Sequence, residues 1–243
     1  QRKEWLNIRR VDRKVFDTAD RPTAQKQASE ENWNSLLASY GINLPPQKKA
    51  SGLEEALESA EEIGYPVVLK LISEQVTHKT EINGVKMGID DADALKKAWD
   101  ELAESADEAG VSMKGGLVQK MLTGGYEVII GIRQDEQFGP LVLFGTGGTD
   151  VELLRDVATG IAPLNRLQAE QLVDQTAAGV KLKGWRNQPE ADRETVIEYL
   201  MRMAQLADDL PAVQELEINP LYVLPKGKGA FAIDIRGTYS EDE

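Results

Sequence analysis

The chain has 243 residues, of which 41% are hydrophobic and 28% charged, and this composition is typical of a globular protein with one or two domains. Its formal net charge of −13 argues against binding to nucleic acid or to an anionic membrane. The sequence shows neither an apolar run of membrane-spanning length nor a signal peptide, and we expect a cytoplasmic protein. With no cysteine and one histidine, the chain cannot form disulfides or a thiolate metal site, so any metal should be oxygen-ligated Mg²⁺ or Mn²⁺.

The first 27 residues are polar and basic, with weak periodicity. We interpret residues 1–27 as an interdomain linker or N-terminal arm, and an added helix remains the alternative. Because an interdomain linker joins two domains, the sequence is expected to be part of a longer polypeptide.

Apolar periodicity and turn residues predict the elements that follow. Helices are expected over residues 29–40, 52–63, 90–109, 167–178 and 192–206, with Ser29 and Ser51 as the N-caps of the first two. Strands are expected over residues 66–71, 85–89, 116–121, 127–133, 140–144, 212–218, 221–224 and 230–235. Helices alternate with strands throughout, which predicts an α+β or layered α/β fold.

A polar loop between the strands over 66–71 and 85–89 contains the single histidine, His78, next to Lys79 and before Gly84. Ammonium groups and backbone amides suit a polyphosphate, and glycine permits close approach. An ordinary surface hairpin explains this stretch equally well. Lys70, at the end of a buried apolar run, should pair either with a core carboxylate or with nucleotide phosphates.

The segment Gly145-Thr146-Gly147-Gly148-Thr149-Asp150 follows a predicted strand and could present backbone amides to a phosphate. It has neither the Walker A nor the dinucleotide-binding spacing, so on its own a glycine-rich turn is the favoured interpretation. The segment from Gln119 to Met121, with Glu127 beyond it, could form a hinge that reads an adenine edge and a ribose. That signal is not specific by itself.

Near the C-terminus, Glu215, Glu217 and Asn219 share one strand face, and Asp234 could lie alongside. These oxygens suit Mg²⁺, which keeps some waters and takes other ligands from phosphate. A solvent-facing acidic stripe is the alternative, and we reject it because Asn219-Pro220 is an unusual continuation of a simple alternating strand.

Together these segments resemble the ATP-grasp subunit of ADP-forming acyl-CoA synthetases, which is related to the succinyl-CoA synthetase β subunit. The resemblance covers about residues 29–237 and is carried by Ile63-Gly64-Tyr65-Pro66-Val67-Val68-Leu69-Lys70, His78-Lys79-Thr80-Glu81-Ile82-Asn83-Gly84-Val85, Gln137-Phe138-Gly139-Pro140-Leu141-Val142-Leu143-Phe144-Gly145-Thr146-Gly147-Gly148, Leu154-Arg155-Asp156-Val157, Ala162-Pro163-Leu164, Glu217-Ile218-Asn219-Pro220-Leu221 and Asp234-Ile235-Arg236. No one of these motifs is specific, but their order is.

The resemblance implies an ATP-grasp fold, in which two α+β subdomains clamp ATP or ADP. Residues 28–237 would form this domain, with about 45–120 as the smaller nucleotide-clamp subdomain and 238–243 as a tail. The nucleotide-binding residues implied are Lys70, Gly84, Gln119, Lys120, Met121 and Glu127. Asn219 and Asp234 would bind Mg²⁺ or Mn²⁺, with Glu217 as a weaker candidate.

The histidine matching His78 carries a phosphoryl group in this family, and a neutral imidazole can attack a γ-phosphorus. Lys79 and Arg155 could offset charge on the transferring group. The family commonly has glycine at the position of Asn83, and because asparagine tolerates positive φ the turn should survive, although loop mobility could differ.

Nothing in the chain resembles a CoA-binding Rossmann domain, so it is expected to be half of an enzyme. Its partner would be a CoA-ligase module, fused or separate, that binds CoA and the acyl substrate, within a homo- or hetero-oligomer. The alternative is a non-catalytic nucleotide sensor within a fused regulator such as a lysine acetyltransferase. The acyl group, ATP against GTP and the direction of the reaction are left open.

Overall fold

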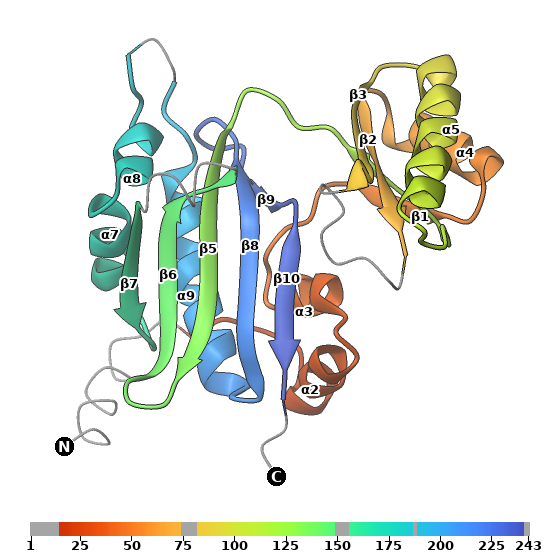
Figure 1. Cartoon of the computed structure of the whole chain (residues 1–243). Coiled ribbons are helices and arrows are strands. Elements are labelled where there is room, and N and C mark those ends of the chain that lie inside the picture. The colour runs from red at the N-terminus through yellow and green to blue at the C-terminus, as the bar shows by residue number, and fades with distance from the viewer. Residues whose placement is uncertain (1–14, 74–81, 149–155, 187–188, 241–243) are drawn as a thin grey trace. The chain divides into compact units, whose positions relative to one another are not determined.

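The computed structural model describes residues 15–73, 82–148, 156–186 and 189–240 (Figure 1). The chain divides into two compact units. The smaller contains Pro45–Thr123, and the larger contains Gln1–Leu44 together with Gly124–Glu243. Within the described ranges, no helix is both long and apolar enough to cross a lipid bilayer.

The smaller unit is a four-stranded antiparallel sheet with two helices on one face (Figure 1). Its strands lie in the order β1 (Gln47–Ala50), β4 (Gly115–Lys120), β2 (Val67–Ile72) and β3 (Val85–Ile89). The helices α4 (Leu53–Ile63) and α5 (Ala92–Glu108) cover it. In α5 the buried residues recur at helical spacing, at Leu95, Ala98, Leu102 and Ala106, and they pack into a core of their own with β2.

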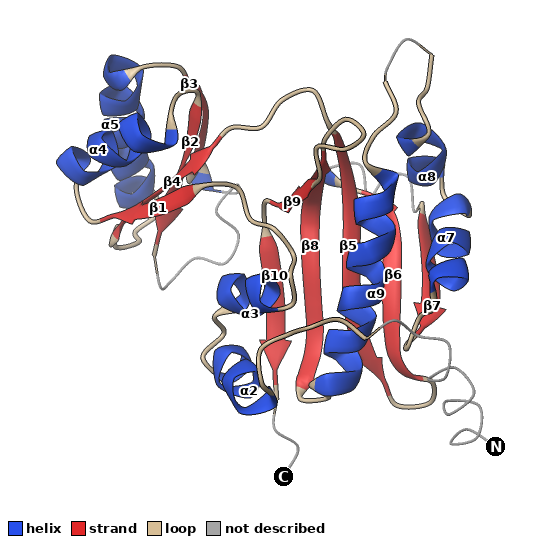
Figure 2. Cartoon of the chain, turned by 180° about the vertical axis from the view of Figure 1, so that it is seen from behind, coloured by secondary structure: helices blue, strands red, loops and turns tan. Residues whose placement is uncertain are grey.

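The larger unit is built on a six-stranded antiparallel sheet. Its strands lie in the order β10 (Ile235–Tyr239), β8 (Val213–Val223), β5 (Tyr126–Asp135), β6 (Gly139–Thr146) and β7 (Val157–Ile161), and β9 (Ala230–Ala232) also pairs with β8. In Figure 2, α9 (Arg193–Asp209) lies across β5 and β6, with α7 (Arg166–Asp174) and α8 (Ala177–Leu182) towards β7. The helices α2 (Arg21–Ser29) and α3 (Trp33–Ser39) lie near β10, and their buried side chains join the same core.

Most predicted elements are confirmed with small shifts at their ends, and the strand over residues 85–89 has the observed bounds. Three of the elements that the structure describes were not predicted, namely α2, β1 and β7. The helix α2 begins within the stretch interpreted as an arm and ends two residues beyond it, so the alternative of an added helix is the observed one for residues 21–29. Likewise β10 extends to Tyr239, into the stretch interpreted as a tail.

Both predicted N-caps are wrong. Ser29 ends α2, and Asn32 caps α3 instead. Gly52 precedes the first residue of α4 without a side-chain cap, while the Ser51 hydroxyl donates to the Glu55 carboxylate at 2.7 Å. Serine is favoured at caps in general, but here its hydroxyl has a carboxylate partner one turn away.

The two strands predicted over residues 212–218 and 221–224 are a single strand. β8 runs over Val213–Val223 through the cis Asn219-Pro220 peptide, and its pairing with β5 shifts register there, between Val128 and Ile130 of β5. Conversely, the single strand predicted over residues 230–235 is split into β9 and β10. The single helix predicted over residues 167–178 is also two helices, because Thr176 caps α8.

Candidate functional site

Three polar residues near the end of β8 form what we call the Asn219 cluster: Glu217, Asn219 and Asp234. Glu217 and Asn219 lie two residues apart on β8 and so share a face. Asp234 directly precedes β10, and its carbonyl accepts a hydrogen bond from the Asn219 backbone N–H at 3.0 Å. The sheet therefore brings together the three residues predicted to bind a metal.

Electrostatics at this cluster favour a cation. Burial, followed by repulsion from Glu215, raises the pKa of the Glu217 carboxyl, while Arg236 and the Asn219 side chain act in the opposite direction. Arg236 also contacts the Asp234 carboxylate, with Nη2 and Oδ2 3.6 Å apart. A raised carboxyl pKa means that the ionised form is poorly compensated, and a bound cation would compensate it.

The donor set fits Mg²⁺ or Mn²⁺, since an amide oxygen and two carboxylates are hard ligands. Within the part of the chain that the structure describes, no group of three or more His, Cys, Asp or Glu side chains forms a ready-made metal site. An ion held by Asn219 and Asp234 would therefore draw its remaining ligands from water and from phosphate oxygens. This is the usual arrangement for Mg²⁺ at a nucleotide.

Gly147 and Gly148, which directly follow β6, lie against the Asn219 cluster. The Gly148 backbone N–H donates to Asn219 Oδ1 at 2.9 Å, and the Gly147 N–H donates to the carbonyl of Glu127 at 3.2 Å. Gly148 has a φ of +72°, and a Cβ built there would meet the Glu127 carboxylate. The backbone at Gly148 therefore approaches Glu127 and the Asn219 cluster more closely than a simple turn requires.

Asp156 belongs to one of the motifs that carry the family resemblance, but no role was predicted for it. Its carboxylate accepts from the Thr146 hydroxyl at 2.6 Å and from the N–H groups of Ala177 and Ala178, which begin α8. Its carbonyl also accepts from the Thr146 N–H at 3.1 Å. Asp156 thus ties the end of β6 to the start of α8, a long-range link that sequence spacing alone cannot reveal.

Burial alone would raise the pKa of Asp156. The hydrogen bonds from Thr146, Ala177 and Ala178 outweigh that effect and hold the pKa below its usual value of 3.8. The carboxylate is therefore ionised at neutral pH and stabilised by its donors.

In the smaller unit, Lys70 lies near the end of β2 and Gly84 directly precedes the neighbouring strand β3. Lys70 lies on β2, with 8% of its surface exposed, and pairs in register with Val85 on β3. The carbonyl of Gly84 accepts from the Leu71 N–H at 2.8 Å. Asn83 has a φ of +54°, which confirms that asparagine adopts the turn conformation expected there.

The predicted adenine hinge is engaged in contacts within its own unit. Gln119 is 2% exposed and donates through Nε2 to Gln47 Oε1 at 2.7 Å. The Lys120 ammonium donates to the carbonyls of Gly64 and Tyr65, at 2.8 and 2.9 Å, where α4 ends. This is a structural role for the Lys120 side chain, because a cation there offsets the helix C-terminus.

The backbone N–H groups of Lys120 and Met121 also donate internally, to the carbonyls of Pro46 and Pro66. Recognition of an adenine edge at this hinge would therefore fall to its carbonyl groups or to the residues that follow. His78, Lys79 and Arg155, the predicted catalytic residues, lie outside the described residues.

The chain matches the sequence profile of the ATP-grasp domain over residues 21–238. It is 40% identical over 204 residues to subunit beta of the ADP-forming acetate–CoA ligase II of Pyrococcus furiosus, covering 83% of this chain and 86% of that subunit. It is 39% identical over 209 residues to the ADP-forming acetate–CoA ligase I of Archaeoglobus fulgidus, covering 85% of this chain and 30% of that protein.

Similar solved structures include a dinucleotide-forming acetyl-coenzyme A synthetase 1 of Ca. Korarchaeum cryptofilum, in two complexes. One, with coenzyme A and Ca-AMPCP, has a TM-score of 0.83 and 33% identity, covering 91% of this chain and 100% of that chain. The other, with coenzyme A and Mg-AMPPCP, is described as having its phosphohistidine segment pointing towards the nucleotide-binding site; it has a TM-score of 0.75 and 33% identity over 88% of this chain and 98% of that chain. These likenesses confirm the fold that the motifs predicted.

Proposed function

Because this chain belongs to the ATP-grasp domain family, we propose that it is the ATP-using component of an ADP-forming acyl-CoA synthetase, an acid–thiol ligase. The observation that supports this most directly is the convergence of Asn219, Asp234 and the Gly148 amide in the larger unit. The chain spans most of a ligase β subunit and about a third of a longer single-chain ligase, which supports a separate or fused CoA-ligase partner module. The sensor alternative is not favoured.

In this role, His78 would attack the γ-phosphorus of ATP. A nitrogen–phosphorus bond would form, the bond to the bridging oxygen would break, and ADP would leave with that electron pair. Lys79 and Arg155 would offset charge on the transferring group, and the phosphoryl group would then pass to the partner module. Mg²⁺ held by Asn219 and Asp234, with Glu217 nearby, would neutralise charge on the phosphates.

We infer that the unit of residues 45–123 is the smaller nucleotide-clamp subdomain predicted over about 45–120. It would contribute Lys70 as a point charge for phosphate, and the carbonyls of the hinge after β4 for adenine. Glu127, beside Gly148, would contact the ribose or phosphates from the larger unit. A cytoplasmic location is consistent with the absence of cysteine and with the need for ATP and CoA.

Labelling with [γ-³²P]ATP and Mg²⁺ tests this proposal in the intact protein. We expect an acid-labile, base-stable label, as a phosphohistidine gives. The His78→Ala variant should still bind ATP but take up no such label, and it should abolish acyl-CoA formation with the partner module. Normal ATP binding without any label in the wild type would instead support a nucleotide sensor.

A further inference from the structure

The chain passes from the larger unit to the smaller between Leu44 and Pro45, and returns between Thr123 and Gly124. Next to each crossover, a backbone N–H donates to the hydroxyl of a tyrosine in the larger unit. We propose that these tyrosines, Tyr199 and Tyr222, are positioning residues that fasten both crossovers to one strand pair, β8 and β9, and thereby support nucleotide binding. The inference rests on the ATP binding proposed above.

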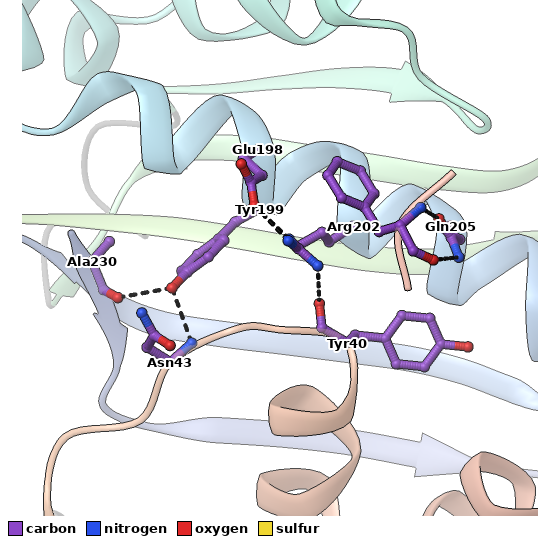
Figure 3. A network of polar contacts seen from close by, with 8 residues as sticks. Tyr40, Asn43, Glu198, Tyr199, Arg202, Gln205 and Ala230 are labelled. Carbon is purple, nitrogen blue, oxygen red and sulfur yellow. Dashed lines mark hydrogen bonds and ion pairs between the residues drawn. The ribbon is translucent and has the colours of Figure 1, made fainter. Parts of the chain in front are cut away.

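The first crossover is held by Tyr199 on α9, a side chain that is 2% exposed. As Figure 3 shows, its hydroxyl accepts from the Asn43 N–H at 3.0 Å and donates to the Ala230 carbonyl at 3.1 Å. The Asn43 carbonyl in turn accepts from the Ala232 N–H at 2.9 Å. Burial raises the pKa of Tyr199, so its hydroxyl keeps the proton it donates at neutral pH. The residue before Leu44 is thus bonded at both its backbone groups.

The second crossover is held by Tyr222 on β8. Its hydroxyl accepts from the Gly125 N–H at 3.2 Å. A Cβ at Gly125 would lie 2.6 Å from the carbonyl oxygen of Val223 and 2.7 Å from the Tyr222 ring, so only glycine fits against the strand here. The next residue, Tyr126, pairs in register with Val223.

The contacts made by Tyr199 and Tyr222 both attach a crossover to the same strand pair, β8 and β9. Val223 pairs with Tyr126 on one side and with Ala230 on the other, so β5 and β9 flank β8, about 10 Å apart. The turn after β8 is itself fixed by Asp192 at the start of α9, whose carboxylate accepts from the Gly229 N–H and whose N–H donates to the Leu224 carbonyl, both at 2.8 Å.

We expect the held crossovers to affect nucleotide binding through entropy. If each unit contributes groups that bind ATP, crossovers held in one conformation restrict the arrangements available to those groups and raise their effective concentration at the nucleotide. In this proposal the tyrosines act through the crossovers that they hold, so loosening one crossover should lower nucleotide affinity. A purely structural tyrosine would change stability without that effect.

The test compares Tyr199→Phe with Gln205→Met in the full protein, together with its partner module. Gln205 is a matched control on the same helix: it is 5% exposed and makes two hydrogen bonds to the N-terminal segment, from the Phe16 N–H and to the Phe16 carbonyl. Two measurements are made, namely the affinity for a non-hydrolysable ATP analogue with Mg²⁺ and amide hydrogen exchange of the ligand-free protein.

We expect Tyr199→Phe to weaken analogue binding about tenfold, the equivalent of about one hydrogen bond, and to speed exchange at residues 42–46. Tyr222→Phe should weaken analogue binding to the same extent and speed exchange at residues 122–126. Gln205→Met should lower stability comparably but leave both readouts within about twofold of wild type.

If both tyrosine variants bind the analogue as wild type does, or if Gln205→Met weakens binding as much as they do, the proposed positioning role of the tyrosines is overturned. If the wild type itself fails to bind the analogue, the proposed function fails instead. The exchange measurement on ligand-free protein then decides the anchoring separately: unchanged exchange at both crossovers would overturn it.

Discussion

The Gly148 backbone N–H donates to the side-chain oxygen of Asn219 at 2.9 Å, across segments that are 71 residues apart in the chain. Asn219 is also the amide ligand proposed for Mg²⁺. A carbonyl oxygen has two lone pairs, so it can accept from Gly148 and face a cation together. The glycine-rich segment and the proposed metal site are therefore coupled within the larger unit.

Replacing Gly148 with alanine should weaken binding of Mg²⁺–ATP several-fold, because the positive φ is strained and the new Cβ collides with Glu127. Gly227→Ala is the matched control, since Gly227 has a φ of +81° with nothing within 4 Å of its Cβ position. Both variants should lose about 1–2 kcal/mol of stability in urea unfolding. Equal ATP affinities in calorimetry would contradict a role for Gly148 in the site.

Asp234→Asn should raise the Mg²⁺ concentration needed for half-maximal nucleotide binding by about tenfold or more, because a charged oxygen ligand is lost. Glu215→Gln removes the same charge from the same sheet, at an exposed residue of β8, and should change that concentration less than about twofold. Mg²⁺ titrations at fixed nucleotide measure both. An unchanged requirement in Asp234→Asn would remove Asp234 from the metal site.

Local sequence pattern predicted the elements that have strong periodicity. The α5 helix has its four buried residues at helical spacing, and the interior strand β2 is a nearly continuous apolar run. β1 was missed because it is a polar edge strand, Gln47–Ala50, and α2 because few of its residues are buried. Such elements owe their structure to tertiary contacts more than to their own composition.

The candidate site was likewise predictable in part from local pattern and in part not, where it depends on tertiary contacts. The meeting of Glu217, Asn219 and Asp234 was predictable from period-two alternation and the neighbouring hairpin. The roles of Asp156 and Tyr199 were not, because their partners are 10 to 156 residues away and depend on how the larger unit folds. Motif order supplied what local pattern could not, since each of the segments quoted is unspecific alone.

We expect Arg202 to contribute to stability but not to ATP binding. Its guanidinium donates to the Tyr40 carbonyl at 3.0 Å and to Glu198 at 2.6 and 2.8 Å, and it lies 4.2 Å from the Phe16 ring centroid (Figure 3). Arg202→Met should therefore lower the free energy of unfolding by about 2–3 kcal/mol. Glu198→Gln, which leaves the other two contacts, should cost about 1 kcal/mol or less. Equal losses in the two variants would show that the contact with Glu198 dominates.

Asp156→Asn should destabilise the protein by about 1–2 kcal/mol at neutral pH, because one acceptor of the Thr146, Ala177 and Ala178 donors becomes an NH₂ group. The effect should depend on pH. Since the folded-state pKa of Asp156 is below the usual 3.8, ionisation stabilises the fold above that value, and this stabilisation is lost as pH falls through the folded-state pKa. The stability gap between wild type and variant should accordingly be constant near neutrality and narrow below about pH 4.

Asp91→Asn is the control for this prediction, because Asp91 caps α5 through the Ala94 N–H and asparagine caps as well as aspartate. Urea unfolding from pH 3 to pH 8 measures the stability of both variants against wild type. If the stability gap of Asp156→Asn stays constant down to pH 3, the assignment of an ionised, stabilising Asp156 carboxylate is refuted.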